Sequence, residues 1–238
     1  MDTIKISSPS KKIVAHRGLS GLEKENSLPA FIAAGNRSYF GVECDIHRTS
    51  DGRFVVIHDA ETARVAGDNL NVENNSFSLV RSVQLNDIDG SKRKDLFIPS
   101  LEEYIKICKK YEKKCVLEIK GVFKEEWIKE VVAIITDLDY LQNVIFIAFD
   151  LQNLLTVRKL LPTQSAQYLT CEWREEFPRI LIENNLALDI HFSQMTKERV
   201  ELLHANGIEV NCWTVDDKET AEKLLEMGVD YITSNILE

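Results

Sequence analysis

The chain has 238 residues, of which 44% are hydrophobic and 28% are charged, with 29 Lys and Arg against 38 Asp and Glu for a formal net charge of −9. This length and apolar content suffice for one large packed domain, and they exclude intrinsic disorder and collagen-like sequence. An acidic chain repels nucleic acid and anionic membranes, so we expect a small-molecule partner, no nucleic acid and no stable membrane association.

Short apolar segments rich in β-branched residues alternate with longer segments of helical periodicity along the whole chain. The expected strands, in chain order, are Ile13–Ala15, Val42–Ile46, Val116–Lys120, Val144–Phe149, Gln167–Thr170, Ala187–His191, Glu209–Trp213 and Tyr231–Thr233. The expected helices are Leu28–Ala34, Leu101–Tyr111, Lys124–Leu138, Leu151–Leu160, Arg174–Glu183, Thr196–Ala205 and Asp217–Met227. Eight strands that each feed a helix predict an α/β fold of the (β/α)8 TIM barrel type, and a doubly wound open sheet is the alternative.

The segment Arg48–Pro99 does not follow this alternation. The turn Ser50-Asp51-Gly52 precedes an apolar segment, Phe54–Ile57, which predicts a hairpin strand, and Asp68–Ser76 is polar and rich in Asn. We therefore expect a single domain spanning residues 1–238, with an insertion at about residues 48–99 after the second strand. We expect the insertion to stand over the mouth of the barrel.

Features that bear on location point to the cytoplasm. The chain has an odd number of cysteines without a Cys-x-x-Cys spacing, which favours a reducing compartment: Cys44, Cys108, Cys115, Cys171 and Cys212. Met1–Lys12 lacks the apolar core of a secretory signal, and no segment approaches the roughly 18 apolar residues that a membrane-spanning helix needs. The oligomeric state is not indicated.

Charged residues occupy alternate positions of two expected strands. In a TIM barrel, reactive side chains lie at the C-terminal ends of the strands and in the loops that follow. Glu43 and Asp45 face the same side of the second strand, and Glu118 and Lys120 repeat this spacing on the third. Converging carboxylates raise one another's pKa values unless a cation neutralises them. Because oxygen ligands without Cys favour hard cations, we predict that Glu43, Asp45 and Glu118 bind Mg²⁺ or Ca²⁺.

Two histidines and two cations complete the predicted site. His16-Arg17-Gly18 follows the first strand, and His58 follows the hairpin strand. Arg17 and Lys120 supply positive charge that can bind a phosphate group in an otherwise acidic protein. Reaction of a phosphate ester near neutral pH needs a base for the attacking oxygen and an acid for the leaving oxygen, and His16 and His58 are the candidates.

Two aromatic residues near the same end of the barrel, Phe149 and Trp213, are candidates for an apolar wall against the organic part of a substrate. Taken singly, each proposed site residue has an ordinary structural interpretation, such as an ion pair, a hydrogen-bonded histidine or a core aromatic residue. The prediction of a site therefore depends on their convergence at one end of one barrel.

Eight segments also match the motifs of a known family, in the family's order and over nearly the whole chain: AHRG (Ala15–Gly18), ENSLPAF (Glu25–Phe31), VECDIHRTSDGRFVVIHD (Val42–Asp59), IPSLEEY (Ile98–Tyr104), LEIK (Leu117–Lys120), AFD (Ala148–Asp150), NCWTVDD (Asn211–Asp217) and GVDYITSN (Gly228–Asn235). In this combination the sequence resembles the bacterial glycerophosphodiester phosphodiesterases. The resemblance implies one role for each matched residue: acid/base catalysis for His16 and His58, metal binding for Glu43, Asp45 and Glu118, and phosphate binding for Arg17 and Lys120.

Glu25 and Asn26 match a motif beside the family's site. We expect Asn26 to orient the groups that bind metal or substrate, and a plain loop or helix-capping role is the alternative. The chain departs from the common pattern at Ser27, where Thr is usual, at Ala148, where Ser often precedes the Phe, and at Ser234-Asn235, where Thr-Asp is frequent. None of these differences removes a proposed ligand or catalytic group.

The resemblance implies a metal-dependent phosphodiesterase that converts glycerophosphodiesters to sn-glycerol 3-phosphate and an alcohol. The sequence leaves open which histidine is the acid, and whether water or the glycerol 2-hydroxyl is the nucleophile. The alternatives are a lysophospholipase D-type enzyme acting on lysophospholipids, a cyclising lyase, and a non-catalytic protein that binds a phosphate ligand.

Overall fold

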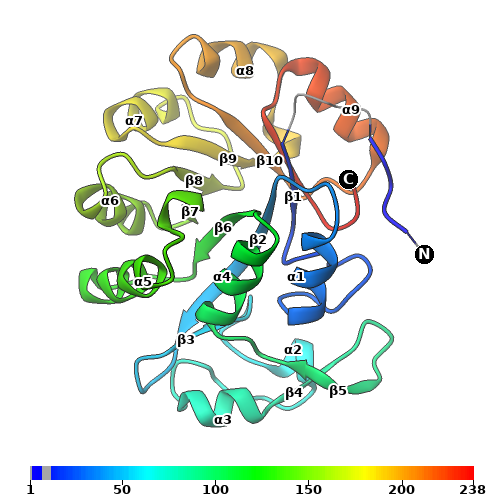
Figure 1. Cartoon of the computed structure of the whole chain (residues 1–238). Helices are drawn as coiled ribbons and strands as arrows, with labels where there is room; N and C mark the ends of the chain where they lie inside the picture. The colour runs from blue at the N-terminus through cyan, green and yellow to red at the C-terminus, as the bar shows by residue number, and fades with distance from the viewer. Residues whose placement is uncertain (1, 7–11) are drawn as a thin grey trace.

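The computed structural model describes residues 2–6 and 12–238 and has a closed parallel sheet at its centre (Figure 1). The strands of this sheet are β1 (Lys12–Ala15), β2 (Gly41–Arg48), β6 (Lys114–Ile119), β7 (Val144–Ala148), β8 (Ala166–Thr170), β9 (Ala187–His191), β10 (Val210–Trp213) and β11 (Tyr231–Ser234). Because β1 pairs with both β11 and β2, the eight parallel strands close into a barrel. The predicted TIM barrel is confirmed, and the open sheet is excluded.

Helices surround the barrel: α1 (Leu28–Gly35), α4 (Leu101–Lys110), α5 (Glu125–Asp137), α6 (Leu151–Leu160), α7 (Phe177–Asn184), α8 (Lys197–His204) and α9 (Lys218–Met227), with short 3₁₀ helices at Leu141–Asn143 and Phe192–Gln194. α7 begins later than expected, with Pro178 in its first turn, where a helix needs no backbone N–H. The expectation that every strand feeds a helix is wrong for β11. The segment after it pairs instead with the N-terminal segment, through the bridge between Ile4 and Leu237.

Alternate side chains of each barrel strand face the helices or the barrel interior. Outward residues join the large apolar core between sheet and helices. Inward residues form a smaller apolar layer, Val14, Val116, Ile145, Ile147, Leu169 and Tyr231. Two residues beyond Val14 and Val116, the inner positions carry His16 and Glu118. The apolar layer therefore supports a polar layer at the C-terminal ends of the strands.

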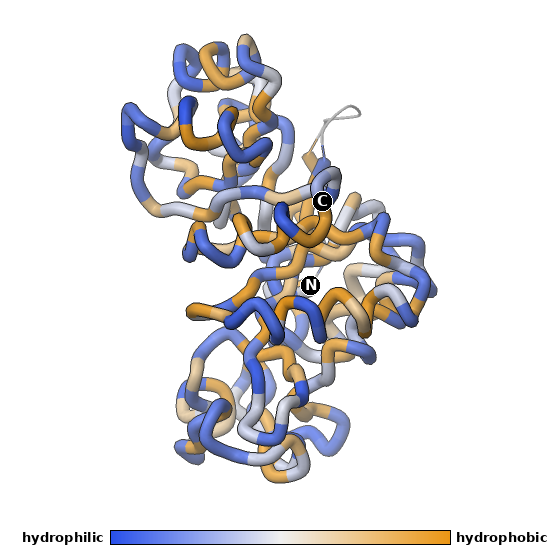
Figure 2. The backbone as a smooth tube through the Cα atoms, turned by 90° about the vertical axis from the view of Figure 1, so that its left-hand side faces the viewer, coloured by the Kyte–Doolittle hydropathy of each residue, from blue (hydrophilic) through white to orange (hydrophobic). Residues whose placement is uncertain are grey.

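The segment between β2 and α4 folds as β3 (Phe54–Val56), α2 (Ala63–Ala66), α3 (Phe77–Ser82), β4 (Gln84–Asn86) and β5 (Lys92–Phe97). β3 pairs antiparallel with the end of β2, which is long enough to continue past the barrel, and the segment encloses an apolar core of its own. Figure 1 places it as a lobe next to α1 and α4, and the same lobe lies at the bottom of the molecule in Figure 2. Most of the segment follows β2 outward, while His58 and Ile88 of the same segment line the two cavities at His16 and Arg17, so the lobe borders the mouth on one side.

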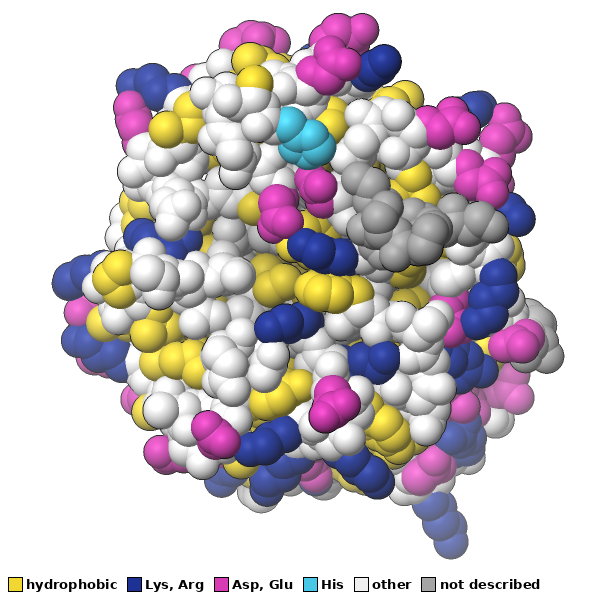
Figure 3. All heavy atoms as spheres, turned by 45° about the horizontal axis from the view of Figure 1, so that its top comes forward, with side chains coloured by type: hydrophobic (Ala, Val, Ile, Leu, Met, Phe, Trp, Pro, Cys, Tyr) yellow, Lys and Arg dark blue, Asp and Glu magenta, His cyan; other side chains and the backbone are white. Residues whose placement is uncertain are grey.

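The surface has no large region of one charge on the face shown in Figure 3, where basic and acidic side chains are interspersed with apolar and uncharged ones. Within residues 2–6 and 12–238, no helix combines the length and the apolar composition needed to cross a membrane.

Candidate active site

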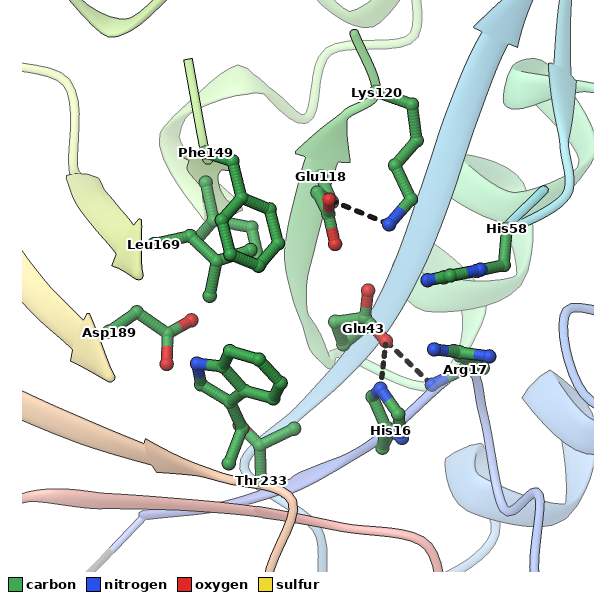
Figure 4. A pocket seen from close by; sticks show the side chains of 12 residues that line it. His16, Arg17, Glu43, His58, Glu118, Lys120, Phe149, Leu169, Asp189 and Thr233 are labelled. Carbon is green, nitrogen blue, oxygen red and sulfur yellow. Dashed lines mark hydrogen bonds and ion pairs between the residues drawn. The ribbon is translucent and has the colours of Figure 1, made fainter. Parts of the chain in front are cut away.

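A cavity of about 330 Å³ opens at the C-terminal ends of the barrel strands (Figure 4). It brings together most residues predicted from the sequence, together with four that were not predicted. Its lining consists of His16, Arg17, Glu43, His58, Glu118, Lys120, Phe149, Trp213, Ile147, Leu169, Asp189 and Thr233. Of the remaining predicted residues, Glu25 contacts Arg17, Asp45 contacts Lys120, and Asn26 contacts Asp45.

The three predicted metal ligands form one buried cluster. Glu43, Asp45 and Glu118 are at most 6% exposed, and one oxygen from each lies within 4.8 Å of the others. The register of the sheet produces this proximity, because Asp45 on β2 pairs with Glu118 on β6. The Lys120 ammonium enters the cluster, 3.0 Å from Asp45 Oδ1 and 2.7 Å from Glu118 Oε1.

The pKa values within this cluster differ in direction. Burial and the neighbouring carboxylates raise the pKa of Glu43 well above its ordinary value, and burial together with Asp45 raises the pKa of Glu118 to about 8. Burial opposes ionisation of Asp45 too, but Lys120 and Arg17 hold the pKa of Asp45 below its ordinary value. The two side-chain cations therefore neutralise only part of the cluster. A divalent cation fits these residues, because hard cations bind carboxylate oxygens and supply the missing positive charge.

The His-Arg-Gly segment turns sharply over the end of β1. Arg17 has φ 52°, and this conformation lets its backbone N–H donate to Glu43 Oε2 at 2.7 Å. Gly18 has φ 76°, and a Cβ atom there would lie 2.7 Å from the backbone of Ala30. Only glycine therefore fits this position without displacing α1. The turn places His16 and Arg17 side by side at the cavity.

The orientation of His16 follows from its hydrogen bonds. Its Nδ1 lies 2.8 Å from Asn235 Oδ1, and the Asn235 amide donates to Asp216 Oδ2 at 2.6 Å. Because a carboxylate only accepts, the Asn235 amide must face Asp216, and its carbonyl oxygen must face His16. Nδ1 therefore carries a proton, and Nε2 faces the cavity, 4.0 Å from Glu43 Oε2. Burial lowers the pKa of His16 to about 4.

His58 is held in a comparable way. Its Nδ1 lies 2.6 Å from Asp59 Oδ1, and Arg64 Nε donates to Asp59 Oδ2 at 2.6 Å. Arg64 also binds Glu25, which accepts from Arg17 at 2.9 Å. Burial lowers the pKa of His58 as well. A continuous chain of ion pairs thus connects the surroundings of the two histidines.

Asn26 and its neighbour Ser27 have separate contacts. Asn26 is 3% exposed, and its amide donates to Asp45 Oδ2 at 2.7 Å. Its φ of 52° is one that asparagine tolerates better than most residues. Ser27 caps α1 instead, because its hydroxyl accepts from the N–H of Ala30. The side chain of Asn26 therefore orients a carboxylate of the cluster rather than capping the helix.

The opposite wall of the cavity is apolar. Phe149 and Trp213 meet edge to face with ring centroids 5.9 Å apart, above Ile147 and Leu169. Asp189 on β9 is a polar residue within this wall. Figure 4 shows the charged residues on β1, β2 and β6 facing Phe149, Leu169 and Asp189 across the cavity.

Besides the lining residues Ile147, Leu169 and Thr233, four polar residues of the site were not predicted: Arg64, Asp189, Asp216 and Asn235. Asp216 and Asn235 both belong to matched segments, and they follow β10 and β11 in the chain. Their position after a strand was therefore a usable signal. Asp189 had a weaker signal, as one acidic residue inside an apolar strand. Arg64 had none, because it belongs to α2 in the lobe, whose helices the sequence pattern did not predict.

This arrangement defines a class of protein. It has a TIM barrel whose mouth holds paired imidazoles, a carboxylate cluster suited to a divalent cation, and two side-chain cations that can bind an anionic ester. Residues 16–237 match the model of the glycerophosphoryl diester phosphodiesterase family. The chain therefore belongs to this family, and the resemblance described above is confirmed.

Individual relatives and solved structures are consistent with membership in this family. A glycerophosphodiester phosphodiesterase of Caldanaerobacter subterraneus subsp. tengcongensis is 28% identical over 226 residues, covering 94% of this chain and 93% of the relative. A structure of a glycerophosphodiester phosphodiesterase from Parabacteroides distasonis is 26% identical with a TM-score of 0.80, covering 96% of this chain and 94% of that one. An Oleispira antarctica phosphodiesterase, solved with the product sn-glycerol-3-phosphate, has the same fold at 24% identity, with a TM-score of 0.82 and coverage of 94% and 93%.

Proposed function

We propose that this enzyme hydrolyses glycerophosphodiesters to sn-glycerol 3-phosphate and an alcohol, with His16 and His58 as its acid/base pair. The observation that carries the proposal is the convergence of both imidazoles with Arg17, Lys120 and the carboxylate cluster on one cavity. Each histidine has its Nδ1 engaged by a neighbour and its Nε2 available. One Nε2 would take the proton from the attacking oxygen, and the other would give a proton to the leaving alcohol.

Glu43, Asp45 and Glu118 are the proposed ligands of Mg²⁺ or Ca²⁺. When bound, such an ion supplies positive charge to phosphoryl oxygens and so favours attack at phosphorus. Asn26 holds Asp45 in place, and the N–H of Arg17 does the same for Glu43. These contacts fix two ligands before a metal arrives, which reduces the ordering that binding requires.

Arg17 and Lys120 are the proposed phosphate contacts. Both already lie against carboxylates, since Arg17 Nε is 3.6 Å from Asp45 and Lys120 is between Asp45 and Glu118. A substrate phosphate would therefore meet side chains that are held in position and desolvated. Charge that develops on phosphoryl oxygens in the transition state is stabilised most strongly by such preorganised groups.

The two organic arms of a diester have separate space. Besides the cavity described above, a second cavity of about 520 Å³ opens beside His16 and Arg17 and shares only these two residues with the first. A phosphate bound at His16 and Arg17 could extend one arm into each cavity. This arrangement supports a diester as substrate in preference to a monoester.

The decisive experiment follows products by phosphorus NMR over a panel of glycerophosphodiesters and lysophospholipids with added Mg²⁺ or Ca²⁺. The proposal requires sn-glycerol 3-phosphate from glycerophosphocholine or a related diester. A persistent cyclic phosphate identifies a cyclising lyase, and turnover of lysophospholipids alone identifies a lysophospholipase D. Binding without turnover of any substrate identifies a non-catalytic protein.

We also propose a cytoplasmic location. All five cysteines are free thiols in the structure, and Cys171 is exposed, which fits a reducing compartment. Cell fractionation of the native host protein tests this proposal, and recovery in an extracellular fraction would contradict it.

A further inference from the structure

We infer that Asp189 and the indole N–H of Trp213 form a subsite that binds a hydroxyl group on an organic arm of the substrate. The inference rests on the proposed function, because it concerns the same cavity. Asp189 is an inner residue of β9, and Figure 4 shows its carboxylate turned toward the cavity, below Leu169 in this view. Trp213 ends the adjacent strand β10, where it pairs with His191.

Two polar atoms in this wall are unpaired. Asp189 is 2% exposed, yet its Oδ1 has no hydrogen-bond partner within the described part of the chain. Trp213 Nε1 is also buried, and it likewise has no partner among the described residues. Buried polar atoms are nearly always paired, and leaving one unpaired costs about 1–3 kcal/mol. An unpaired acceptor and an unpaired donor in the wall of one cavity indicate a ligand group that satisfies both.

The nearest polar side chain leaves Asp189 Oδ1 unpaired. Asn211 donates to Gln167 Oε1 at 3.3 Å and accepts from the Thr233 hydroxyl at 3.1 Å. Its amide also opposes the rise that burial causes in the pKa of Asp189, but Oδ1 has no partner among the described residues. The rest of the wall consists of apolar side chains, including Ile147 and Leu169. A ligand that enters this half of the cavity therefore meets a polar pair surrounded by apolar surface.

The chemistry of the pair favours a hydroxyl over other groups. The cations that would bind a phosphate, Arg17 and Lys120, lie with the carboxylate cluster and not beside this pair. An ammonium group only donates, so it would leave Trp213 Nε1 unpaired. A hydroxyl group can donate to Asp189 and accept from Trp213 at once.

The protonation of Asp189 is compatible with this assignment. Burial raises the pKa of Asp189 to about 8, against the opposing influence of the Asn211 amide. Near neutral pH the carboxyl group is therefore largely uncharged, and a neutral carboxylic acid can both donate to and accept from a hydroxyl. No buried charge then has to be desolvated when the ligand enters.

The experiment uses two pairs of phosphodiesters that differ by one hydroxyl. The first pair is glycerophosphoethanol and its analogue with propane-1,2-diol in place of glycerol, which keeps the 2-hydroxyl. The second is glycerophosphoglycerol and its analogue whose leaving alcohol is propane-1,2-diol. Each pair is measured with wild type, Asp189→Asn, Asp189→Leu and the wall variant Leu169→Ala, and glycerophosphoethanolamine is added to test an ammonium group. Calorimetric binding of sn-glycerol 3-phosphate and of its 1-deoxy analogue is measured separately.

We expect wild type to prefer the hydroxylated member of one pair by about tenfold or more in kcat/KM, because a site built for a hydroxyl rejects an analogue that leaves its polar groups unpaired. The pair concerned identifies the arm that is bound. Asp189→Leu should reduce this preference to within about threefold, Asp189→Asn should retain most of it, and Leu169→Ala should slow both members alike.

Three results would overturn the inference: no hydroxyl preference in wild type for either pair, an unchanged preference in Asp189→Leu, or a preference for the ammonium substrate that Asp189→Leu abolishes. The hydroxyl preference of wild type tests the inference even if Asp189→Leu does not fold. If no diester is hydrolysed, the proposed function fails, and the subsite is then judged by whether wild type binds sn-glycerol 3-phosphate more tightly than the deoxy analogue.

Discussion

The mouth of the barrel has a charged half and an apolar half. Parallel strands of similar geometry form both halves, but their side chains suit different chemistry. In the charged half, β1, β2 and β6 end in His16, the carboxylate cluster and Lys120. In the apolar half, β7, β8 and β10 present Ile147, Leu169 and Trp213 at comparable inner positions. The backbone pattern is the same in both halves, so the contrast arises entirely from the side chains at the inner positions.

The two halves also differ in how their side chains are held. In the charged half almost every group is fixed by partners outside the cavity, such as Asn235 for His16, Asp59 for His58 and Asn26 for Asp45. In the apolar half, packing alone positions Phe149, which remains 44% exposed. We therefore expect the charged half to control the rate of the chemical step, and the apolar half to control which organic arm is accepted.

The largest effect is expected from the carboxylate cluster. Asp45→Asn or Glu118→Gln should lower kcat/KM by about a thousandfold or more, because the cluster would hold the ion that neutralises phosphoryl charge. Chelation of wild type should have a similar effect, and Mg²⁺ or Ca²⁺ should restore turnover. The measurements are steady-state kinetics and calorimetric titration of each ion. Glu183→Gln, on the exposed surface of α7, is the matched control.

Binding of the ion should also raise the melting temperature, since it relieves repulsion among Glu43, Asp45 and Glu118 in the folded state. Full turnover in excess chelator after exhaustive dialysis would contradict the metal site. The contrast between the halves would then rest on Lys120, Arg17 and the two histidines.

The next largest effect is expected from the histidines. His16→Gln or His58→Gln should lower kcat by about a hundredfold or more while the affinity for metal is largely kept, because neither is a proposed ligand. A nitrophenyl ester needs little protonation of its leaving group, so it should rescue the variant that lacks the acid but not the variant that lacks the base. His204→Gln on α8 serves as control. Wild-type turnover of ordinary diesters by either folded variant would rule out the two-histidine mechanism.

The contrast between the halves also shows what the sequence could predict. The strands were recognisable in the sequence as short apolar segments. Because parallel strands of a barrel all end at the same face, the residues at their C-terminal ends could be assigned to one site from the sequence alone. Glu43, Asp45 and Glu118 were assigned to one site in this way, and the structure brings them together. The partners that hold them could not all be found, because a contact such as the one between Arg64 and Glu25 depends on where the lobe packs.

The lobe was the least predictable part of the fold. β5 contains four charged residues in six, Lys92, Arg93, Lys94 and Asp95, and has no apolar alternation. It forms a strand because β4 pairs with it and because Leu96 joins the apolar core of the lobe. Tertiary contacts therefore override its weak local preference. The contribution of Asp189 was not predicted for the opposite reason. Its strand was correctly predicted, but only the three-dimensional structure shows its unpaired oxygen.

Substitution of Lys120 tests whether this cation contacts the substrate phosphate or only pairs with Asp45 and Glu118. Lys120→Ala should reduce transition-state stabilisation by about 2 kcal/mol, the scale of removing one positioned electrostatic donor. The measurement is kcat/KM together with thermal unfolding, and Lys129→Ala on the surface of α5 is the control. If stability falls while kcat/KM barely changes, Lys120 is a structural partner of Asp45 and Glu118 and does not contact phosphate.

The smallest effect is expected from the apolar half. Phe149→Ala should raise KM by about three- to tenfold for diesters with a bulky alcohol, because the lost ring contacts ground state and transition state alike. kcat should remain within about threefold of wild type, since no group that moves a proton is removed. The free energy of unfolding should change by about 1 kcal/mol or less, because the ring is already 44% exposed. Ile182→Ala, which removes a similarly exposed apolar side chain from α7, should change neither kinetic constant. A fall in kcat of a hundredfold with KM unchanged would show that the apolar half takes part in the chemical step, and the division of labour between the two halves would have to be abandoned.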